Sequence, residues 1–289
     1  MNPTTVVSDV ASSSAEVRFD YEGQSIAFSS VASEDHILRD MQTRRTFYEQ
    51  DVLERLRERL CKRQEAGAAV DAGAFIGSHS IYFAKFCGLK PVLSFEANPN
   101  TFPRLLQNID MNRVTGTVIP INTALGSGPG YARVISSDIT NQGHSSVAFN
   151  AGQTSESVPV TALDDEVEAA LGRTRRVALI KIDVEGAELE VLNGAKRTIK
   201  ASRPVLCIEV HNLENLRKVL FALRGERYWI IDCLGYSPTY VMEATDSIFP
   251  RRFLVNLLWL VRAAIPAQPH KLCVLARRHL RRLAQTLSA

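Results

Sequence analysis

Short apolar runs alternate with amphipathic segments along the chain from residue 68 onward. Apolar runs bounded by turn residues predict buried strands, and apolar positions at helical spacing predict helices. The predicted strands are 69–72, 92–96, 117–121, 158–162, 177–183, 205–210 and 228–233. The predicted helices are 78–87, 99–112, 164–171, 187–201 and 213–225. This order is typical of a doubly wound α/β fold with a mostly parallel sheet, whose ligands bind beyond the carboxyl ends of the strands.

The flanking segments follow other patterns. A weak strand-turn-strand pattern spans 17–28, with its turn at Glu22-Gly23, and helical spacing of apolar residues follows over 47–61. Residues 124–160 are rich in Gly, Ser, Asn and Thr, which predicts an irregular, hairpin-bearing excursion. The expected units are an N-terminal leader and helical cap (1–66), the α/β domain (67–248) and a basic, amphipathic helical tail (249–289).

Charge is distributed unevenly. Eight of the 34 Lys and Arg residues follow Asp246, but none of the 31 Asp and Glu residues does. Residues 1–246 therefore carry a formal net charge of −5 and the remainder +8, although the whole chain carries only +3. A basic tail on a mildly acidic body is typical of a segment that meets an anionic partner.

The tail suggests three alternatives. Between Lys271 and Leu287, leucines occupy one helical face and arginines the other, so one hypothesis is peripheral contact of 250–289 with an anionic membrane. The second hypothesis is that the tail packs against the body or a subunit. Binding of the tail to nucleic acid is the weakest of the three hypotheses. The apolar stretch 253–265 contains Asn256 and Arg262 and is too short to span a bilayer.

The remaining composition indicates the compartment. Five scattered cysteines without a C-x-x-C pair argue against a disulfide framework, and the first residues lack the basic and apolar regions of a secretory signal. We therefore expect a cytoplasmic protein, at the inner face of the membrane if the tail binds there.

The first predicted strand ends in a glycine-containing turn. Asp71, Gly73 and Gly77 stand in V-D-A-G-A-F-I-G, with Ser78 opening the next helix. Glycines at such a turn let the backbone approach a ligand at a helix N-terminus. A tight turn without a ligand explains the same spacing, which is not that of a dinucleotide or P-loop motif.

An acidic residue, Glu96, ends the second predicted strand, and its carboxylate is suited to accept hydrogen bonds from both hydroxyls of a ribose. The alternative is a solvated carboxylate at a strand end. Together with the glycine turn, Glu96 predicts a nucleoside site.

Further acids end two later strands. Asp183 and Glu185 follow the strand in L-I-K-I-D-V-E-G, and Glu209 and His211 end the next strand in I-E-V-H-N. Neighbouring parallel strands would bring these groups to one edge. Carboxylates beside an imidazole predict a general base or an oxygen-rich site for an ion such as Mg²⁺, although no residue is assigned as a metal ligand. The alternative is that His211 has no part in such a site and is a capping histidine or a hydrogen-bonded histidine of the core.

In this order, V-D-A-G-A-F-I-G, S-F-E-A-N-P, T-A-L-G, I-K-I-D-V-E-G-A-E and C-I-E-V-H-N resemble the motifs of the FkbM-type methyltransferases. The resemblance covers roughly 40–235. It implies a seven-stranded class I methyltransferase fold that uses S-adenosylmethionine, usually to methylate a hydroxyl of a sugar or polyketide. The Gly/Ser-rich stretch 143–152 and the basic tail lie outside the family pattern, and the former is a candidate for acceptor specificity.

The resemblance also implies roles for individual residues. Asp71, Gly73 and Gly77 would border the methionine part of the cofactor, and Glu96 would hold its ribose. The segment beginning at Ala124 would pass the adenine. Asp183 and Glu185 correspond to the acidic motif beside the transferred methyl group.

Methyl transfer to a hydroxyl requires alignment of both reactants and removal of the hydroxyl proton. We predict Asp183 as the base or as a metal ligand, assisted by Glu209 and His211. The acceptor would be a small molecule or glycan. Two alternatives stay open. One is a nucleic-acid methyltransferase, but such enzymes often carry N-P-P-Y/F where this chain has D-V-E-G. The other is a binding module without catalysis.

Overall fold

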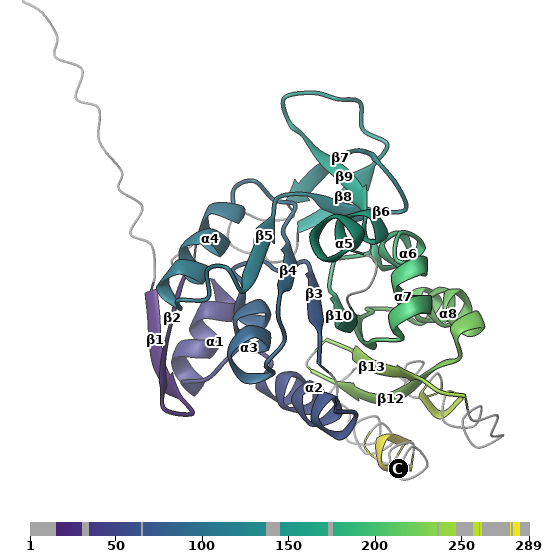
Figure 1. The fold of residues 1–289 in the computed structure, drawn as a ribbon, viewed down its shortest axis with the longest axis horizontal. Helices are drawn as coiled ribbons and strands as arrows, with labels where there is room; N and C mark the ends of the chain where they lie inside the picture. Colours follow the sequence, from purple (N-terminus) through teal and green to yellow (C-terminus); the bar gives the residue numbers. More distant parts are fainter. Residues whose placement is uncertain are drawn as a thin grey trace, which may run out of the picture.

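A mixed sheet of seven strands forms the centre of the molecule (Figure 1). The computed structural model describes residues 16–30, 35–64, 66–136, 145–172, 176–235, 237–246, 257–259, 261, 278 and 280–283. In spatial order the strands are β12 (Tyr228–Leu234), β13 (Thr239–Ala244), β11 (Val205–Glu209), β10 (Val177–Ile182), β3 (Ala68–Ala72), β4 (Val92–Phe95) and β5 (Val118–Ile121). Only β13 runs antiparallel to its neighbours, so the predicted, mostly parallel sheet is confirmed.

Helices cover both faces of this sheet, which explains why its central strands are apolar along their whole length. One core cluster joins one sheet face to the N-terminal hairpin, α1 (His36–Arg44), α2 (Gln50–Lys62), α3 (Ser78–Phe86) and α4 (Phe102–Met111). The other cluster joins the opposite face to α5 (Leu163–Leu171), α6 (Glu188–Asn193), α7 (Lys196–Ser202) and α8 (Leu213–Ala222), which the short 3-10 helix η2 (Arg224–Glu226) follows. Every residue of β3 and β10 is buried.

The N-terminal segment packs onto the first of these faces. β1 (Glu16–Tyr21) and β2 (Gln24–Ser29) form the predicted hairpin, and α2 overlaps the helix predicted over 47–61. Asn108 of α4 and Asn112, the C-cap of that helix, accept hydrogen bonds from backbone amides of β2 at 2.8 and 3.1 Å. These buried contacts fix the hairpin against the sheet.

The segment predicted as an irregular excursion forms a second sheet of four strands. Its spatial order is β6 (Ala124–Gly126), β9 (Ser157–Ala162), β7 (Gly130–Ser136) and β8 (Ser145–Phe149). Figure 1 shows this sheet beyond the ends of β4 and β10. The small sheet therefore stands over the edge where the candidate site residues were expected.

Three predicted elements differ in detail. The helix predicted from Pro99 begins at Phe102, because the Asn98 side chain accepts a hydrogen bond from the amide of Asn100 and holds a turn there. The helix predicted over 187–201 is divided into α6 and α7 at Gly194, where a Cβ atom would lie 2.0 Å from the carbonyl oxygen of Gly126. The antiparallel strand β13 was not predicted.

Most of the basic tail lies outside the described residues, as does most of the predicted Lys271–Leu287 helix. Within the described part, Trp259 is buried in the second core cluster, and Nε of Arg281 lies 3.5 Å from Oδ1 of Asp232. Among the described helices, none combines the length and the apolar character needed to span a membrane. The unit boundaries at residues 66 and 248 stay predictions.

Candidate active site

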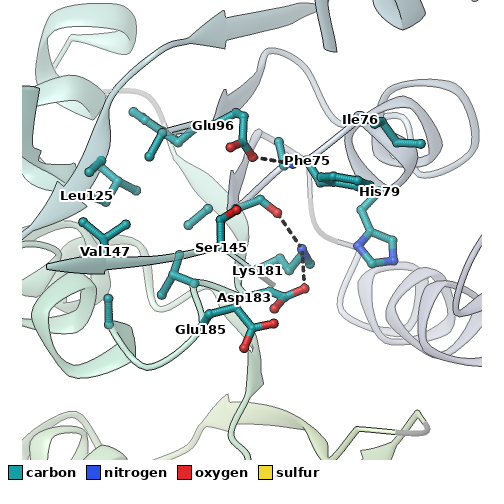
Figure 2. A pocket seen from close by; sticks show the side chains of 18 of the residues that line it. Phe75, Ile76, His79, Glu96, Leu125, Ser145, Val147, Lys181, Asp183 and Glu185 are labelled. Atoms are coloured by element: carbon teal, nitrogen blue, oxygen red, sulfur yellow. Dashed lines mark hydrogen bonds and ion pairs between the residues drawn. The ribbon is translucent and has the colours of Figure 1, made fainter. Parts of the chain in front are cut away.

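An open cavity with an empty volume of about 920 Å³ lies at the carboxyl ends of β3, β4 and β10. Its wall combines the turn after β3, the end of β4, the start of β6, two residues of β8 and the segment after β10. Figure 2 shows the side chains of Glu96, Ser145, Lys181, Asp183 and Glu185 around this space. The sequence motifs that end successive strands therefore meet in one cavity, and the Gly/Ser-rich stretch contributes Ser145 and Val147.

Gly73 forms the closest backbone approach in the cavity wall. Its φ is +81°, and a Cβ atom there would lie 1.8 Å from the carbonyl oxygen of Asp183. The amides of Gly73 and Ala74 both donate to the carbonyl of Phe95, at 3.0 and 2.8 Å. Only glycine fits this turn, so the backbone itself lines the cavity between β4 and β10.

Gly77 lies just beyond that turn as the N-cap of α3, with a φ of +87°. It does not line the cavity itself, whereas Ile76, Ser78 and His79 around it do. The hydroxyl oxygen of Ser78 is buried and has no hydrogen-bond partner among the described residues. The start of α3 therefore presents an unsatisfied polar group at the wall.

Glu96 is buried at the end of β4, and each of its carboxylate oxygens accepts one backbone hydrogen bond. The amide of Phe75 donates to Oε2 and the amide of Asn98 donates to Oε1, both at 2.8 Å. Burial raises the pKa of Glu96 to about 7, while the two amides act in the opposite direction. Each oxygen keeps acceptor capacity for a further hydroxyl, as a ribose would require.

The residue that sequence analysis missed at this site is Lys181. Its Nζ lies 3.3 Å from Oδ1 of Asp71 and 3.2 Å from Oδ2 of Asp183, and it donates to the carbonyl of Gly73 at 3.2 Å. These two carboxylates raise the pKa of Lys181 above its ordinary value, despite its burial. A lysine inside an otherwise apolar strand was the sequence feature that could have revealed it.

Asp71, like Gly77, lies outside the cavity wall although it was predicted as a cofactor residue. It is fully buried; besides Lys181 it accepts a hydrogen bond from the hydroxyl of Ser80 at 2.6 Å. Its carboxylate therefore acts on the cavity through Lys181. Direct contact of Asp71 with a cofactor stays a prediction.

Asp183 and Glu209 form a carboxylate pair at the ends of β10 and β11. Burial and the neighbouring charge of Asp183 raise the pKa of Glu209 to about 9. The charge of Lys181 and the hydrogen bond from Glu209 lower the pKa of Asp183, against the effect of burial. At neutral pH, Asp183 is therefore ionised and Glu209 carries the shared proton.

His211 lies beside this pair at the same edge. Its Nε2 is 3.0 Å from Oε2 of Glu185 and 3.7 Å from Oε1 of Glu209. Glu185 lines the cavity and lies in the turn that precedes α6. The structure thus brings together all four residues predicted for the acid cluster. An imidazole held by a carboxylate can accept a proton.

The remaining predicted position, Ala124, is buried at the start of β6 and lines the cavity together with Leu125. The cavity also includes Ile37 and Tyr48 from the N-terminal segment, which sequence analysis did not single out. Nothing in the local sequence pattern places that segment over the strand ends.

The metal hypothesis finds no support in the geometry. Across the part of the chain that the structure describes, no group of three or more His, Cys, Asp or Glu side chains is arranged to hold a metal ion. The ammonium of Lys181 beside Asp183 would also repel a cation at that carboxylate.

The fold and the cavity define an α/β protein with an open cavity at the carboxyl ends of its strands. The family described as Methyltransferase FkbM domain matches residues 71–228, more than half of the chain. The chain belongs to this family of methyltransferases. The match is shorter than the span of roughly 40–235 expected from the motifs.

Two curated relatives resemble part of the chain. Hexuronic acid methyltransferase AglP of Haloferax volcanii is 35% identical over 164 residues, which cover 56% of this chain and 62% of the relative. Methyltransferase 1 of Beauveria bassiana is 32% identical over 143 residues, covering 43% of this chain and 57% of the relative. The chain thus spans about three fifths of the length of these relatives.

Among solved structures, the methyltransferase FkbM of Methylobacillus flagellatus KT is similar at 17% identity and a TM-score of 0.45. The similarity covers 62% of this chain and 43% of that one.

Proposed function

We propose that this chain is an S-adenosylmethionine-dependent O-methyltransferase that acts on a hydroxyl of a sugar, a glycan or a related natural product. The observation that carries the proposal is the single cavity that connects Glu96, past Gly73, with Asp183 and Glu185. Membership of the FkbM family supports the methyl donor. The similarity to a hexuronic acid methyltransferase supports a sugar-type acceptor.

The residues present fit this cofactor. Glu96 would accept hydrogen bonds from the ribose hydroxyls, and Ala124 and Leu125 would form the apolar wall beside the base. The backbone of Gly73 and the unsatisfied hydroxyl of Ser78 would border the amino-acid end. When bound, S-adenosylmethionine supplies a methyl group on a sulfonium, and the neutral thioether that departs needs no acid catalyst.

The wall of the cavity would hold the acceptor oxygen in line with that methyl group. Alignment of two reactants contributes on the order of 7–11 kcal/mol to lowering a barrier. A sugar hydroxyl must also lose its proton. His211 would accept it; this residue does not line the cavity but contacts the cavity wall through Glu185. Glu185 would orient the imidazole through the 3.0 Å contact and stabilise the imidazolium that forms.

Asp183 would accept a hydrogen bond from the hydroxyl of the substrate that receives the methyl group, and would thereby position that hydroxyl. Its lowered pKa makes it a weak base, and Lys181 already holds one of its oxygens. Glu209 would assist by sharing its proton with Asp183 and by lying 3.7 Å from His211.

The test combines cofactor binding with transfer of a labelled methyl group. Calorimetry should detect S-adenosylmethionine binding, and label should enter the glycan fraction of a cell-envelope extract as a methyl ether. His211→Gln should slow transfer ~10²–10⁴-fold without changing cofactor affinity. Glu214→Gln, at an exposed position of α8, should leave the transfer rate unchanged. Absence of cofactor binding, or label found only in nucleic acid, would overturn the proposal.

For the tail, we propose contact of 250–289 with an anionic membrane. Because Trp259 is buried in the body, deleting the whole tail would disturb the core as well. Replacing the arginines at 278 and 282 by glutamine is a cleaner test, since both side chains are exposed. The fraction of protein recovered with floated anionic liposomes should be lower for this double variant than for the parent chain. Equal fractions for the two proteins would refute the proposal.

A further inference from the structure

A smaller recess adjoins the cavity beside Asp183. It shares His79, Lys181 and Asp183 with the main cavity. The rest of its wall comes from Glu49, from apolar residues of α2 and from the ends of β11 and β13. Under the proposed function, the recess therefore lies next to the place where the methyl group is transferred.

Glu49 and His79 face each other in this recess. Oε2 of Glu49 lies 3.6 Å from Nε2 of His79, and about nine tenths of each side chain is buried. Nε2 of His79 has no hydrogen-bond partner within the described parts of the chain. An unsatisfied buried nitrogen of this kind costs free energy unless a ligand or water pairs with it.

The charges of the wall limit which group can enter. Among the described residues of the wall, the carboxyl groups of Asp183, Glu49 and Glu209 outnumber the one ammonium, that of Lys181. Because this ammonium already pairs with Asp71 and Asp183, a further carboxylate in the recess would be unfavourable. Burial lowers the pKa of His79 to about 4, which leaves its ring neutral. A hydroxyl can donate to the free nitrogen of His79 and also bond to the carboxyl group of Glu49.

The size of the recess agrees with this chemistry. Its open space admits a group about as large as one water molecule, which is enough for a hydroxyl but not for a sugar ring. The ring of an acceptor would then lie in the main cavity, with one substituent in the recess.

We propose that the recess binds a second, unreacting hydroxyl of a neutral sugar acceptor, and that Glu49 and His79 thereby determine which hydroxyl reaches the methyl group. The inference rests on the proposed function and specifies the class of acceptor substrate, a neutral polyol. The name of the relative AglP, by contrast, refers to a hexuronic acid, which is charged. Glu49 lies outside the family match of 71–228, so this determinant belongs to the chain's own N-terminal segment.

Calorimetry on the full chain saturated with S-adenosylhomocysteine tests the inference. The probes are the methyl glycosides of glucose, mannose and galactose, with methyl glucuronoside as the charged counterpart. At least one neutral glycoside should bind at least fivefold more tightly than the glucuronoside. Glu49→Gln should weaken that binding at least fivefold, whereas Glu54→Gln, at an exposed position of the helix that Glu49 precedes, should not.

The outcomes separate this inference from the proposed function. If S-adenosylhomocysteine does not bind, the proposed function fails. If it binds but no neutral glycoside does, or if either fivefold difference is missing, only the assignment of the recess is overturned. Should Glu49→Gln alter circular dichroism or S-adenosylhomocysteine affinity, His79→Gln is judged by the same fivefold criterion.

Discussion

Lys181 and Asp71 occupy the same register position on the adjacent parallel strands β10 and β3, and their charged groups lie 3.3 Å apart. Both side chains are buried in the centre of the sheet. The same lysine contacts Asp183 at the cavity wall, so the interior of the sheet is connected electrostatically to the candidate active site. Removal of the lysine would leave a buried carboxylate without its counter-charge.

We therefore expect Lys181→Met to destabilise the fold by ~3–5 kcal/mol, the range for breaking a buried pair on one side only. Urea unfolding followed by circular dichroism measures the change. Lys218→Met, at a half-exposed position paired with Glu214, should change the free energy of unfolding by only about 0.5 kcal/mol. A similar small change for Lys181→Met would show that Asp71 does not depend on the pair.

The sequence predicted the parallel core and the edge of the sheet at which the cavity lies. Buried strands that end in Gly73, Glu96 and Asp183 have to bring these residues to one edge, because parallel strands align their carboxyl ends. The apolar pattern of the strand around Lys181 predicts a buried strand but does not predict a partner for this lysine. The pairing of one lysine with one aspartate in two such strands becomes visible only when the register is known.

Other features depend on tertiary packing that local patterns do not encode. Tyr48 and Glu49 lie over the strand ends next to Phe47, whose ring packs against Phe19 and Phe28 of the hairpin. The break at Gly194 follows from the close approach of Gly126 in β6. The sequence of the small sheet predicts an irregular segment because its short strands contain many Gly and Ser residues, which weaken the strand pattern.

The turn at Gly73 offers a second prediction. Gly73→Ala places a Cβ atom against the carbonyl of Asp183 at a positive φ, so we expect a loss of about 2 kcal/mol or more in the free energy of unfolding. The variant should also lose affinity for S-adenosylhomocysteine, because the backbone must move at the cavity wall. Gly128→Ala, where nothing lies within 4 Å of the added atom, is the matched control. Equal stability of the two variants would contradict the model of a tight turn.

Glu96 provides a prediction about binding. In Glu96→Ala the carboxylate that faces the proposed ribose is lost, and hydrogen bonds to a charged group are worth about 1.5–3 kcal/mol. Affinity for S-adenosylhomocysteine in calorimetry should therefore fall at least tenfold. Glu156→Ala, an exposed position in the chain, should bind like the parent protein. Unchanged affinity in Glu96→Ala would remove this residue from the cofactor site.

Glu209 makes stability depend on pH in a defined direction. Burial, followed by the charge of Asp183, raises its pKa in the folded state to about 9, against 4.5 when unperturbed. Between these values the folded state holds a proton that the unfolded state has released. The contribution of Glu209 to stability is therefore fully present below about pH 4.5 and is lost as the pH rises toward 9.

Replacement by glutamine removes this titration while it keeps the size of the side chain. From pH 5 to pH 8, the parent protein should lose on the order of 1 to 3 kcal/mol of unfolding free energy relative to Glu209→Gln. The comparison isolates Glu209 from Glu49 and Glu96, whose raised pKa values affect both proteins alike. Urea titrations at each pH measure the difference between the two proteins. A difference that stays constant with pH would mean that Glu209 ionises normally, and the shared proton with Asp183 would then have no basis.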